Sequence, residues 1–270
     1  MESILASRRP PDAFEVICVD NGSSDATSSI LNTFQPSIKV IHEAKRGPAA
    51  ARNAGLRAAT REFAAFTDAD CTVDSSWLTH LLGPLQAGKA GAVGGKILPR
   101  QEAGRVEQFG ALVHDHQKAI EDDNPPYVIT MNLAARTEML HSIGLFDERL
   151  IRMEDVDLAY RIVAAGERIA YQPDAVVYHH NRDTLRTLAR EGFLHGYYRP
   201  AFLHLHRQFI DDYRKMAESQ PNARSTARLA EPPAAAATLQ PWRVGFYWKI
   251  FNWSKKAGEM AGRRMSPRLG

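Results

Sequence analysis

The sequence has few cysteines, no long apolar run and little net charge. Its 270 residues include two cysteines, Cys18 and Cys71, too few for a disulfide framework or a zinc cluster. This low count is typical of a protein from a reducing cytosol. No run reaches the roughly 18 apolar residues that a membrane-spanning helix needs, and the first residues lack the apolar centre of a signal peptide. We therefore predict a cytoplasmic protein.

The charge distribution says more than the total. The net charge of +3 is too small to indicate nucleic-acid binding. Residues 241–270, however, carry seven basic residues and one acidic residue, which leaves the other 240 residues slightly acidic. With 44% hydrophobic and 24% charged residues, the composition is that of a globular protein with a sizeable core.

Strands and helices alternate in the first part of the sequence. Short apolar runs at 14–19, 37–41 and 62–67 predict buried strands, and the segments 26–34 and 47–59 predict helices between them. This order predicts an α/β protein with a mostly parallel, Rossmann-like central sheet flanked by helices. Ligands of such sheets bind beyond the carboxyl ends of the strands.

Carboxylates follow two of these strands. Asp20 ends the first strand, and Asp68-Ala69-Asp70 follows the third. Carboxylate oxygens suit Mn²⁺ or Mg²⁺, and such an ion can hold a diphosphate. Aspartates are also common in turns after strands, so Asp20 is either a ligand-binding residue or a turn residue.

A second acidic cluster opens a predicted helix at 154–165. Glu154, Asp155 and Asp157 lie in its first turn. The helix dipole stabilises acids at this position, which explains two of the three. The third exceeds what capping needs, and an ionised carboxylate held here suits a general base.

Histidines raise two further possibilities. His179-His180 ends a strand-like segment, whereas His114-Asp115-His116 lies in a predicted loop where we expect no metal site. Residues 127–132 predict another strand. Trp77 lies in a predicted helix at 75–87 whose apolar spacing places it in the core first.

The C-terminal part is predicted to be helical at 184–217, with a break near Pro200, and flexible at 218–240, where proline, alanine and polar residues dominate. Residues 242–262 predict an amphipathic helix with aromatic and basic side chains. It either lies on an anionic membrane surface or docks on the protein body. The predicted domains are thus 1–182, a helical extension at 183–217, a linker at 218–240 and a basic helix at 241–270.

Four segments, in order and spacing, resemble the family 2 glycosyltransferases of the GT-A fold. The resemblance covers roughly residues 1–182. The segments are FEVICVDNGSSDAT at 14–27, GPAAARNAG at 47–55, TDADC at 67–71 and GLFDERLIRMEDVDLAYR at 144–161.

The resemblance implies a role for each matching residue. Asp70 would bind Mn²⁺ or Mg²⁺ together with Asp68, and Asp155 would be the catalytic base, with Glu154 as its rival. His179, or else His180, would be a further metal ligand or touch the diphosphate. The residues implied in nucleotide-sugar binding are Asp20, Asn21, Arg52, Asn53, Asp68 and, on the acceptor side, Asn132.

The implied reaction is inverting transfer of a sugar from a nucleotide-sugar donor to an acceptor hydroxyl. The acceptor would be a cell-envelope glycan or a lipid-linked glycan, reached from the inner face of a membrane through residues 241–264. One alternative is a nucleotidyltransferase, but the glycine-rich stretch at 91–96 comes too late for its triphosphate loop. The other is a non-catalytic, membrane-associated module.

Proteins of this family begin with a strand ahead of the first helix. This sequence starts inside the helix that follows. Either the true start lies upstream or the protein lacks that strand, and in the second case we expect weaker donor binding.

Overall fold

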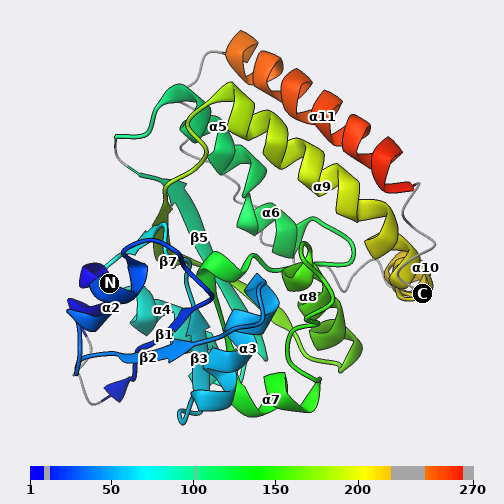
Figure 1. Ribbon diagram of the computed structural model, residues 1–270. Helices are drawn as coiled ribbons and strands as arrows, with labels where there is room; N and C mark the ends of the chain where they lie inside the picture. The colour runs from blue at the N-terminus through cyan, green and yellow to red at the C-terminus, as the bar shows by residue number, and fades with distance from the viewer. Residues whose placement is uncertain (9–12, 101, 220–240, 264–270) are drawn as a thin grey trace. The chain divides into compact units, whose positions relative to one another are not determined.

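The computed structural model describes residues 1–8, 13–100, 102–219 and 241–263 (Figure 1). The chain divides into two compact units. The first unit comprises residues 1–96 and 127–177, and the second comprises 97–126 and 178–270. Each unit is described by itself, and the boundaries of the predicted domains stay predictions.

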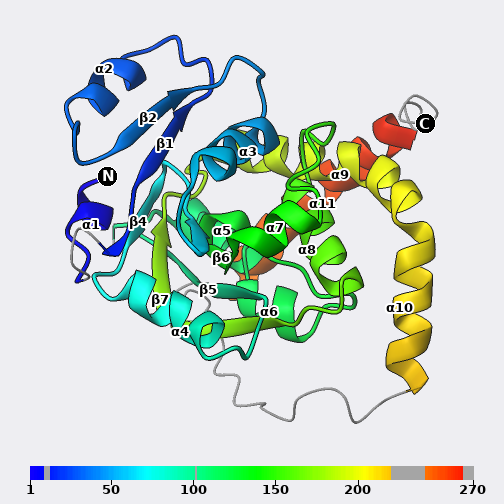
Figure 2. The same ribbon diagram turned by 90° about the horizontal axis from the view of Figure 1, so that it is seen from below.

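The first unit begins with helix α1 (Glu2–Leu5) and a parallel strand pair. Strand β1 (Ile17–Asp20) pairs with β2 (Lys39–His42) so that Asp20 lies opposite His42. Helices α2 (Thr27–Asn32) and α3 (Pro48–Ala58) both contact β1 (Figure 2). The predicted strand–helix–strand–helix order is confirmed here, with shifts of a few residues at the ends.

A five-stranded sheet forms the centre of the fold. Its strand order is β3-β6-β5-β7-β4, and its strands are β3 (Phe63–Phe66), β4 (Cys71–Val73), β5 (Ala92–Pro99), β6 (Leu133–Arg136) and β7 (Ile169–His179). The α/β class is confirmed. Within this sheet β6 runs antiparallel to both β3 and β5, whereas β1 and β2 form a separate parallel pair.

The predicted strand at 127–132 is wrong. That segment ends in a short 3-10 helix (Thr130–Asn132), and the strand β6 follows it. The strand β6 was not predicted, because Ala134 and Ala135 have low strand propensity. Both alanines are fully buried in the sheet.

Helix α4 (Trp77–Gln86) covers the sheet with its apolar face. Trp77, Leu78, Leu81 and Leu85 pack in one cluster with residues of β4, β5, β6 and β7. Helices α7 (Thr137–Ser142) and α8 (Glu154–Ala164) complete the first unit. Trp77 is thus a core residue, as its helical spacing predicted.

The second unit is mainly helical. It contains α5 (Arg105–Val113), α6 (His116–Glu121), α9 (Leu185–Leu205), α10 (Arg207–Ser219) and α11 (Pro241–Arg263). Helix α9 contacts both α5 and α11, and Phe109, Leu188, Tyr247 and Phe251 form the core among the three helices (Figure 1). Among the described residues, no helix is both long enough and apolar enough to cross a membrane.

Three predictions about this unit need correction or restriction. The loop predicted at His114-Asp115-His116 is the junction of two helices, since His114 caps the end of α5 and His116 begins α6. Both helices are too short for a periodic pattern to show in the sequence. The break in the long helix is at His206, while Pro200 lies inside α9. The predicted linker lies outside the described residues from residue 220 onward.

Gly95 supplies a stability test in the central sheet. A Cβ atom there would lie 2.3 Å from the backbone oxygen of Ala175 and 2.5 Å from the amide nitrogen of Asn132. We expect Gly95→Ala to lower the free energy of unfolding by about 1–3 kcal/mol through overpacking, measured by urea unfolding. Gly55→Ala is the control, because its Cβ would meet Val19 at an ordinary 3.5 Å inside a helix. Equal effects of both substitutions would contradict the prediction.

Candidate active site

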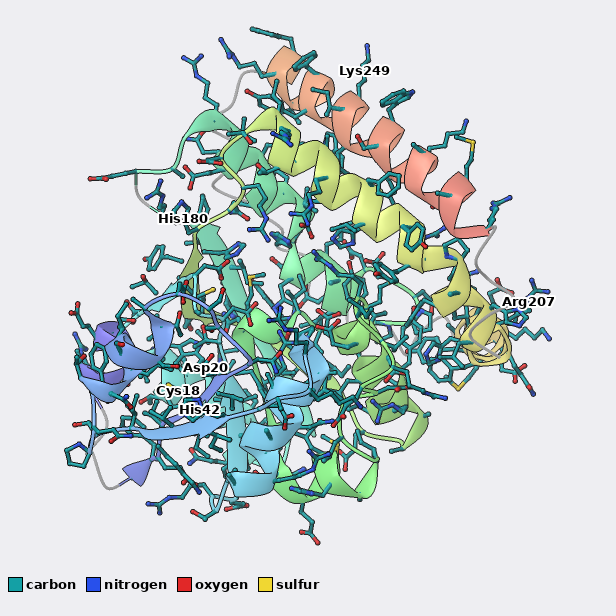
Figure 3. The ribbon with its side chains drawn as sticks, in the orientation of Figure 1. Cys18, Asp20, His42, His180, Arg207 and Lys249 are labelled. Carbon is teal, nitrogen blue, oxygen red and sulfur yellow. The ribbon has the colours of Figure 1, made fainter. Side chains whose placement is uncertain are left out.

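Asp20 lies at the carboxyl end of β1 with a side chain that is almost fully buried. Its Oδ1 accepts a 3.0 Å hydrogen bond from Ser23 N, and its Oδ2 accepts one from the Ser28 hydroxyl. His42 Nδ1 lies 3.4 Å from Oδ2, and Figure 3 labels both residues at the strand ends. Hydrogen bonds from Ser23 and Ser28 lower the pKa of Asp20 to about 2. Asp20 is therefore a fixed negative charge that orders the turn after β1.

Asn21 ties the turn after β1 to the loop after β2. Its Nδ2 donates to the carbonyl oxygens of Glu43 at 3.0 Å and Lys45 at 2.7 Å. Its Oδ1 accepts from Gly47 N at 2.7 Å. Gly47 has a φ of 134° and precedes Pro48 at the start of α3, so this clamp sets where α3 begins. The structure gives Asn21 a positioning role beside the predicted nucleotide contact.

Arg52 joins the two acidic segments that the sequence predicted. From α3, its Nη1 donates to Glu154 Oε1 at 2.7 Å and its Nη2 donates to Asp68 Oδ1 at 3.1 Å. Its guanidinium also lies over the Phe146 ring, 5.6 Å from the centroid. Burial by itself lowers the pKa of Arg52, but the charges of Asp68, Glu154 and Asp155 outweigh it and raise the pKa. The side chain is thus a permanent cation that is mostly buried among carboxylates, with 16% of its surface exposed.

The two candidate bases at the start of α8 differ in burial and in their partners. Glu154 is buried and its carboxylate pairs with Arg52, whereas Asp155 is partly exposed. Adjacent residues of a helix point about 100° apart, so only one of them faces Arg52 directly. The third acid, Asp157, is buried and pairs with Arg161 at 2.6 Å on the same helix. Of the three acids, Asp155 best fits a base that takes a proton from a ligand.

Met153 gives the helix start an unusual backbone. It precedes α8 with a φ of 67°, which lies in the left-handed region that residues other than glycine rarely adopt. This conformation costs about 1–2 kcal/mol, so surrounding contacts must hold it. Strain of this kind gathers at functional sites.

Contacts from α3 hold the segment before Met153. Asn53 is buried; its Nδ2 donates to Phe146 O, and its Oδ1 accepts from Phe146 N, both at 2.9 Å. Glu148 accepts hydrogen bonds from Asn53, Lys45 and Arg57. These three bonds, with Asn53 contributing most, lower the pKa of Glu148 to about 2. The sequence reasoning missed this network, although Glu148 lies within the segment that it singled out.

The Asp-x-Asp turn offers oxygen donors of the kind that Mn²⁺ and Mg²⁺ prefer. Asp70 is exposed, and Cys71 N closes the turn on the carbonyl oxygen of Asp68 at 3.1 Å. Burial, together with the charges of Asp68 and Asp70, raises the pKa of the Cys71 thiol to about 12. Carboxylate oxygens are therefore the donors here, which fits a hard cation. Asp70 is the candidate metal ligand, because its carboxylate is exposed at the turn.

Asn132 has a different position from the one predicted on the acceptor side. Its side chain, at the end of the 3-10 helix before β6, is fully buried. Its Oδ1 accepts from Trp77 Nε1 at 2.8 Å, and its Nδ2 donates to the carbonyl oxygens of Lys96 and Ala175, both at 2.9 Å. All of its polar atoms are satisfied inside the protein, so Asn132 holds α4 to the sheet. The family resemblance implied a ligand contact for this residue, but in the structure its amide binds core residues.

The histidines lie in the second unit. His179 ends β7 and is buried, with its Nδ1 2.8 Å from Asn181 Oδ1 and its ring against that of His114. His180 is about half exposed, with its Nε2 3.4 Å from Glu107. Burial lowers the pKa of His114 to about 4. The metal-binding role of His179 or His180 stays a prediction.

Comparison with known proteins decides the family. Residues 1–144, more than half of the chain, match the family described as Glycosyl transferase family 2. The chain belongs to glycosyl transferase family 2. A pre-mycofactocin glycosyltransferase of Mycobacterium tuberculosis is 35% identical over 192 residues, which are 67% of this chain and 41% of that protein. Glycosyltransferase AglE of Haloferax volcanii is 26% identical over 186 residues, which are 66% of this chain and 60% of that protein. The chain thus spans about two fifths of the mycobacterial relative's length.

Solved structures show the same fold. The mannosyltransferase PcManGT from Pyrobaculum calidifontis, in complex with GDP-Man and Mn²⁺, has a TM-score of 0.61 at 22% identity and covers 99% of this chain and 82% of that chain. Residues 1–349 of S. aureus TarS, in complex with UDP-GlcNAc, have a TM-score of 0.56 at 16% identity and cover 98% and 86%. The predicted GT-A type of the α/β fold is confirmed.

The lowered pKa values predict a loss of stability in acid. Glu148 has a pKa of about 2 in the folded protein, below its unfolded value of about 4.3. Its contribution is therefore complete above that unfolded value and is lost as the pH falls toward about 2. We expect the free energy of unfolding in urea to decrease between about pH 5 and about pH 3. Glu148→Gln removes up to one proton from the proton uptake on unfolding. The slope of the unfolding free energy against pH should therefore be smaller by up to about 1.4 kcal/mol per pH unit. An unchanged slope in Glu148→Gln would show that this carboxyl does not contribute.

Proposed function

We propose that this protein is an inverting glycosyltransferase that moves a sugar from a nucleotide-sugar donor to an acceptor hydroxyl. One observation carries the proposal: Arg52 binds both Asp68 of the Asp-x-Asp turn and Glu154 beside Asp155. The donor-binding turn and the candidate base are thereby held by one side chain. Membership of glycosyl transferase family 2 supports sugar transfer over nucleotidyl transfer.

Each side chain has a definite task in the proposed reaction. Asp155 accepts the proton of the acceptor hydroxyl as that oxygen attacks the anomeric carbon. The bond from that carbon to the diphosphate oxygen breaks, and the nucleoside diphosphate leaves with the electron pair. A single displacement inverts the anomeric configuration. Asp70 would hold a divalent cation, with Asp68 and His179 as further candidate ligands, and Mn²⁺ or Mg²⁺ bound there would supply positive charge to the departing diphosphate.

Residues around this centre orient the donor. Asp20 presents a fixed carboxylate at the end of β1, where it can accept a hydrogen bond from the ribose or base. Two carboxylates and the Phe146 ring hold the side chain of Arg52 in place. Arg52 therefore keeps Asp68 in position for the donor sugar, and neither side chain has to be ordered when the donor binds. Asn53 and Asn21 act through the loops that they hold.

Relatives support the substrate classes. The solved neighbours contain GDP-Man or UDP-GlcNAc, and one relative with 27% identity is named an O-antigen chain rhamnosyltransferase. We extend this to a nucleotide-sugar donor and a cell-envelope or lipid-linked glycan acceptor. A non-catalytic module is the alternative. It would release no nucleoside diphosphate from any nucleotide sugar, which a coupled assay of diphosphate release measures directly.

Two neighbouring substitutions separate catalysis from structure. Asp155→Asn should lower kcat by about 10²–10⁴-fold, because it removes the general base, while the Kd of the nucleoside diphosphate stays unchanged. Its Tm should fall less than that of Glu154→Gln, because Asp155 is the weakest of the three charges that raise the pKa of Arg52. Glu154→Gln should instead lower Tm, because it leaves the buried Arg52 cation without its shortest ion pair. Steady-state kinetics and thermal unfolding of both variants test this. A loss of kcat confined to Glu154→Gln would reverse the assignment.

Asp70→Ala tests the metal site. We expect calorimetric titration with UDP, GDP and dTDP to show Mn²⁺-dependent binding of one of them, lost in EDTA and in Asp70→Ala. Asp122→Ala, an exposed aspartate after α6, is the matched control and should bind like the parent protein. Full binding by Asp70→Ala would show that this carboxylate does not hold the cation.

A further inference from the structure

Helix α11 packs against α9 along a glycine seam, which consists of Gly192 and Gly196 of α9 and Gly258 and Gly262 of α11. A Cβ atom on Gly196 or Gly192 of α9 would clash with the backbone oxygen of Lys255 or Phe251 on α11. A Cβ atom on Gly258 or Gly262 of α11 would clash with backbone oxygens of α9. The backbones therefore touch along the seam, which fixes the face of α11 that is turned to α9. Tyr247, Phe251 and Ser254 on this face are buried.

The opposite face of α11 carries a continuous exposed stripe. Its members follow one another at alternating spacings of four and three residues, so they lie on one side of the helix. The exposed fractions of the four apolar members range from 47% at Phe246 to 76% at Trp253. The stripe consists of Trp242, Phe246, Lys249, Trp253, Lys256 and Met260.

Positive charge accompanies the apolar side chains. Lys249 and Lys256 stand within the stripe, and Figure 3 shows Lys249 pointing away from α9. Arg243 lies over the Trp242 ring at 4.5 Å, and Arg263 is exposed at the helix end. A shallow hollow of about 630 Å³ runs beside the stripe, lined by Trp248, Trp253 and the two lysines among others. Exposed tryptophan beside lysine is typical of a helix that lies in a lipid interface.

A second copy of the chain fits this face poorly. In a helix pair built on the stripe, Lys249 and Lys256 would occupy seam positions that a stable coiled coil fills with apolar residues. On a lipid surface the same lysines place their methylene chains among the acyl chains and their ammonium groups at the phosphates. The position of the lysines thus distinguishes the two occupants.

We propose that the stripe on α11 docks in the plane of an anionic phospholipid bilayer, with Trp242, Phe246, Trp253 and Met260 inserted below the headgroups and Lys249 and Lys256 paired with lipid phosphates. The proposal does not rest on the proposed enzymatic function, because binding is measured without donor or acceptor. It gives the predicted peripheral contact of residues 241–264 a defined orientation about the helix axis. The glycine seam holds that orientation.

Vesicle co-sedimentation of the full chain tests the proposal. We expect binding to vesicles of phosphatidylcholine with phosphatidylglycerol and little binding to pure phosphatidylcholine. Lys249→Gln with Lys256→Gln should weaken binding about thirty-fold, from about 1 kcal/mol per basic residue at the surface. Trp253→Gln should weaken it by at least about ten-fold through lost apolar burial.

Matched variants keep the test specific. Lys89→Gln with Lys118→Gln removes the same charge from exposed positions outside α11, and Met216→Gln removes an exposed apolar side chain of α10. Both should bind vesicles like the parent protein, and circular dichroism should show unchanged helix content in all variants. Equal loss in the control variants, equal binding to neutral vesicles, or no binding would overturn the proposal. So would a dimer in sedimentation equilibrium that Trp253→Gln dissociates.

Discussion

The site in the first unit depends on the ion pairs that the mostly buried guanidinium of Arg52 makes with Asp68 and Glu154. A buried cation is tolerated only when carboxylates surround it and satisfy its donors. Asp68 and Glu154 do so from positions 16 and 102 residues away along the chain. The cation therefore joins the turn after β3 to the start of α8. Because both carboxylates are needed to stabilise one cation, neither segment can move independently at low cost.

The remaining contacts keep the start of α8 in place. Asn53, the residue after Arg52, binds the backbone of Phe146 through both its amide nitrogen and its amide oxygen. The ring of Phe146 lies beneath the Arg52 guanidinium. One helix thus holds the chain before and at the acidic cluster. These contacts hold the chain ahead of Met153, whose backbone is in the left-handed region. The position of Asp155 follows from α3 as much as from its own helix.

The sequence predicted the places of the acids better than their partners. Strand periodicity was sufficient to place Asp20 and Asp68 at strand ends, because a short apolar run followed by a turn is a local pattern. The ion pairs of Arg52 join residues distant in sequence, so no local pattern reports them. Asn132 shows the converse limit: the family resemblance implied a ligand contact, but the side chain is buried and hydrogen-bonded to Trp77 and two carbonyl groups. Strand β6 was missed because its alanines carry no strand signal.

The most direct test of this account is a double-mutant cycle between Arg52 and Glu154. The free energy of unfolding would be measured in urea for the parent protein, Arg52→Gln, Glu154→Gln and the double variant. The account predicts that each single substitution strands a buried charge, so the double variant should be more stable than the sum of the two effects by about 1–3 kcal/mol. Additive effects would contradict it, because Arg52 would then not depend on Glu154 and the two acidic segments would not be coupled through it.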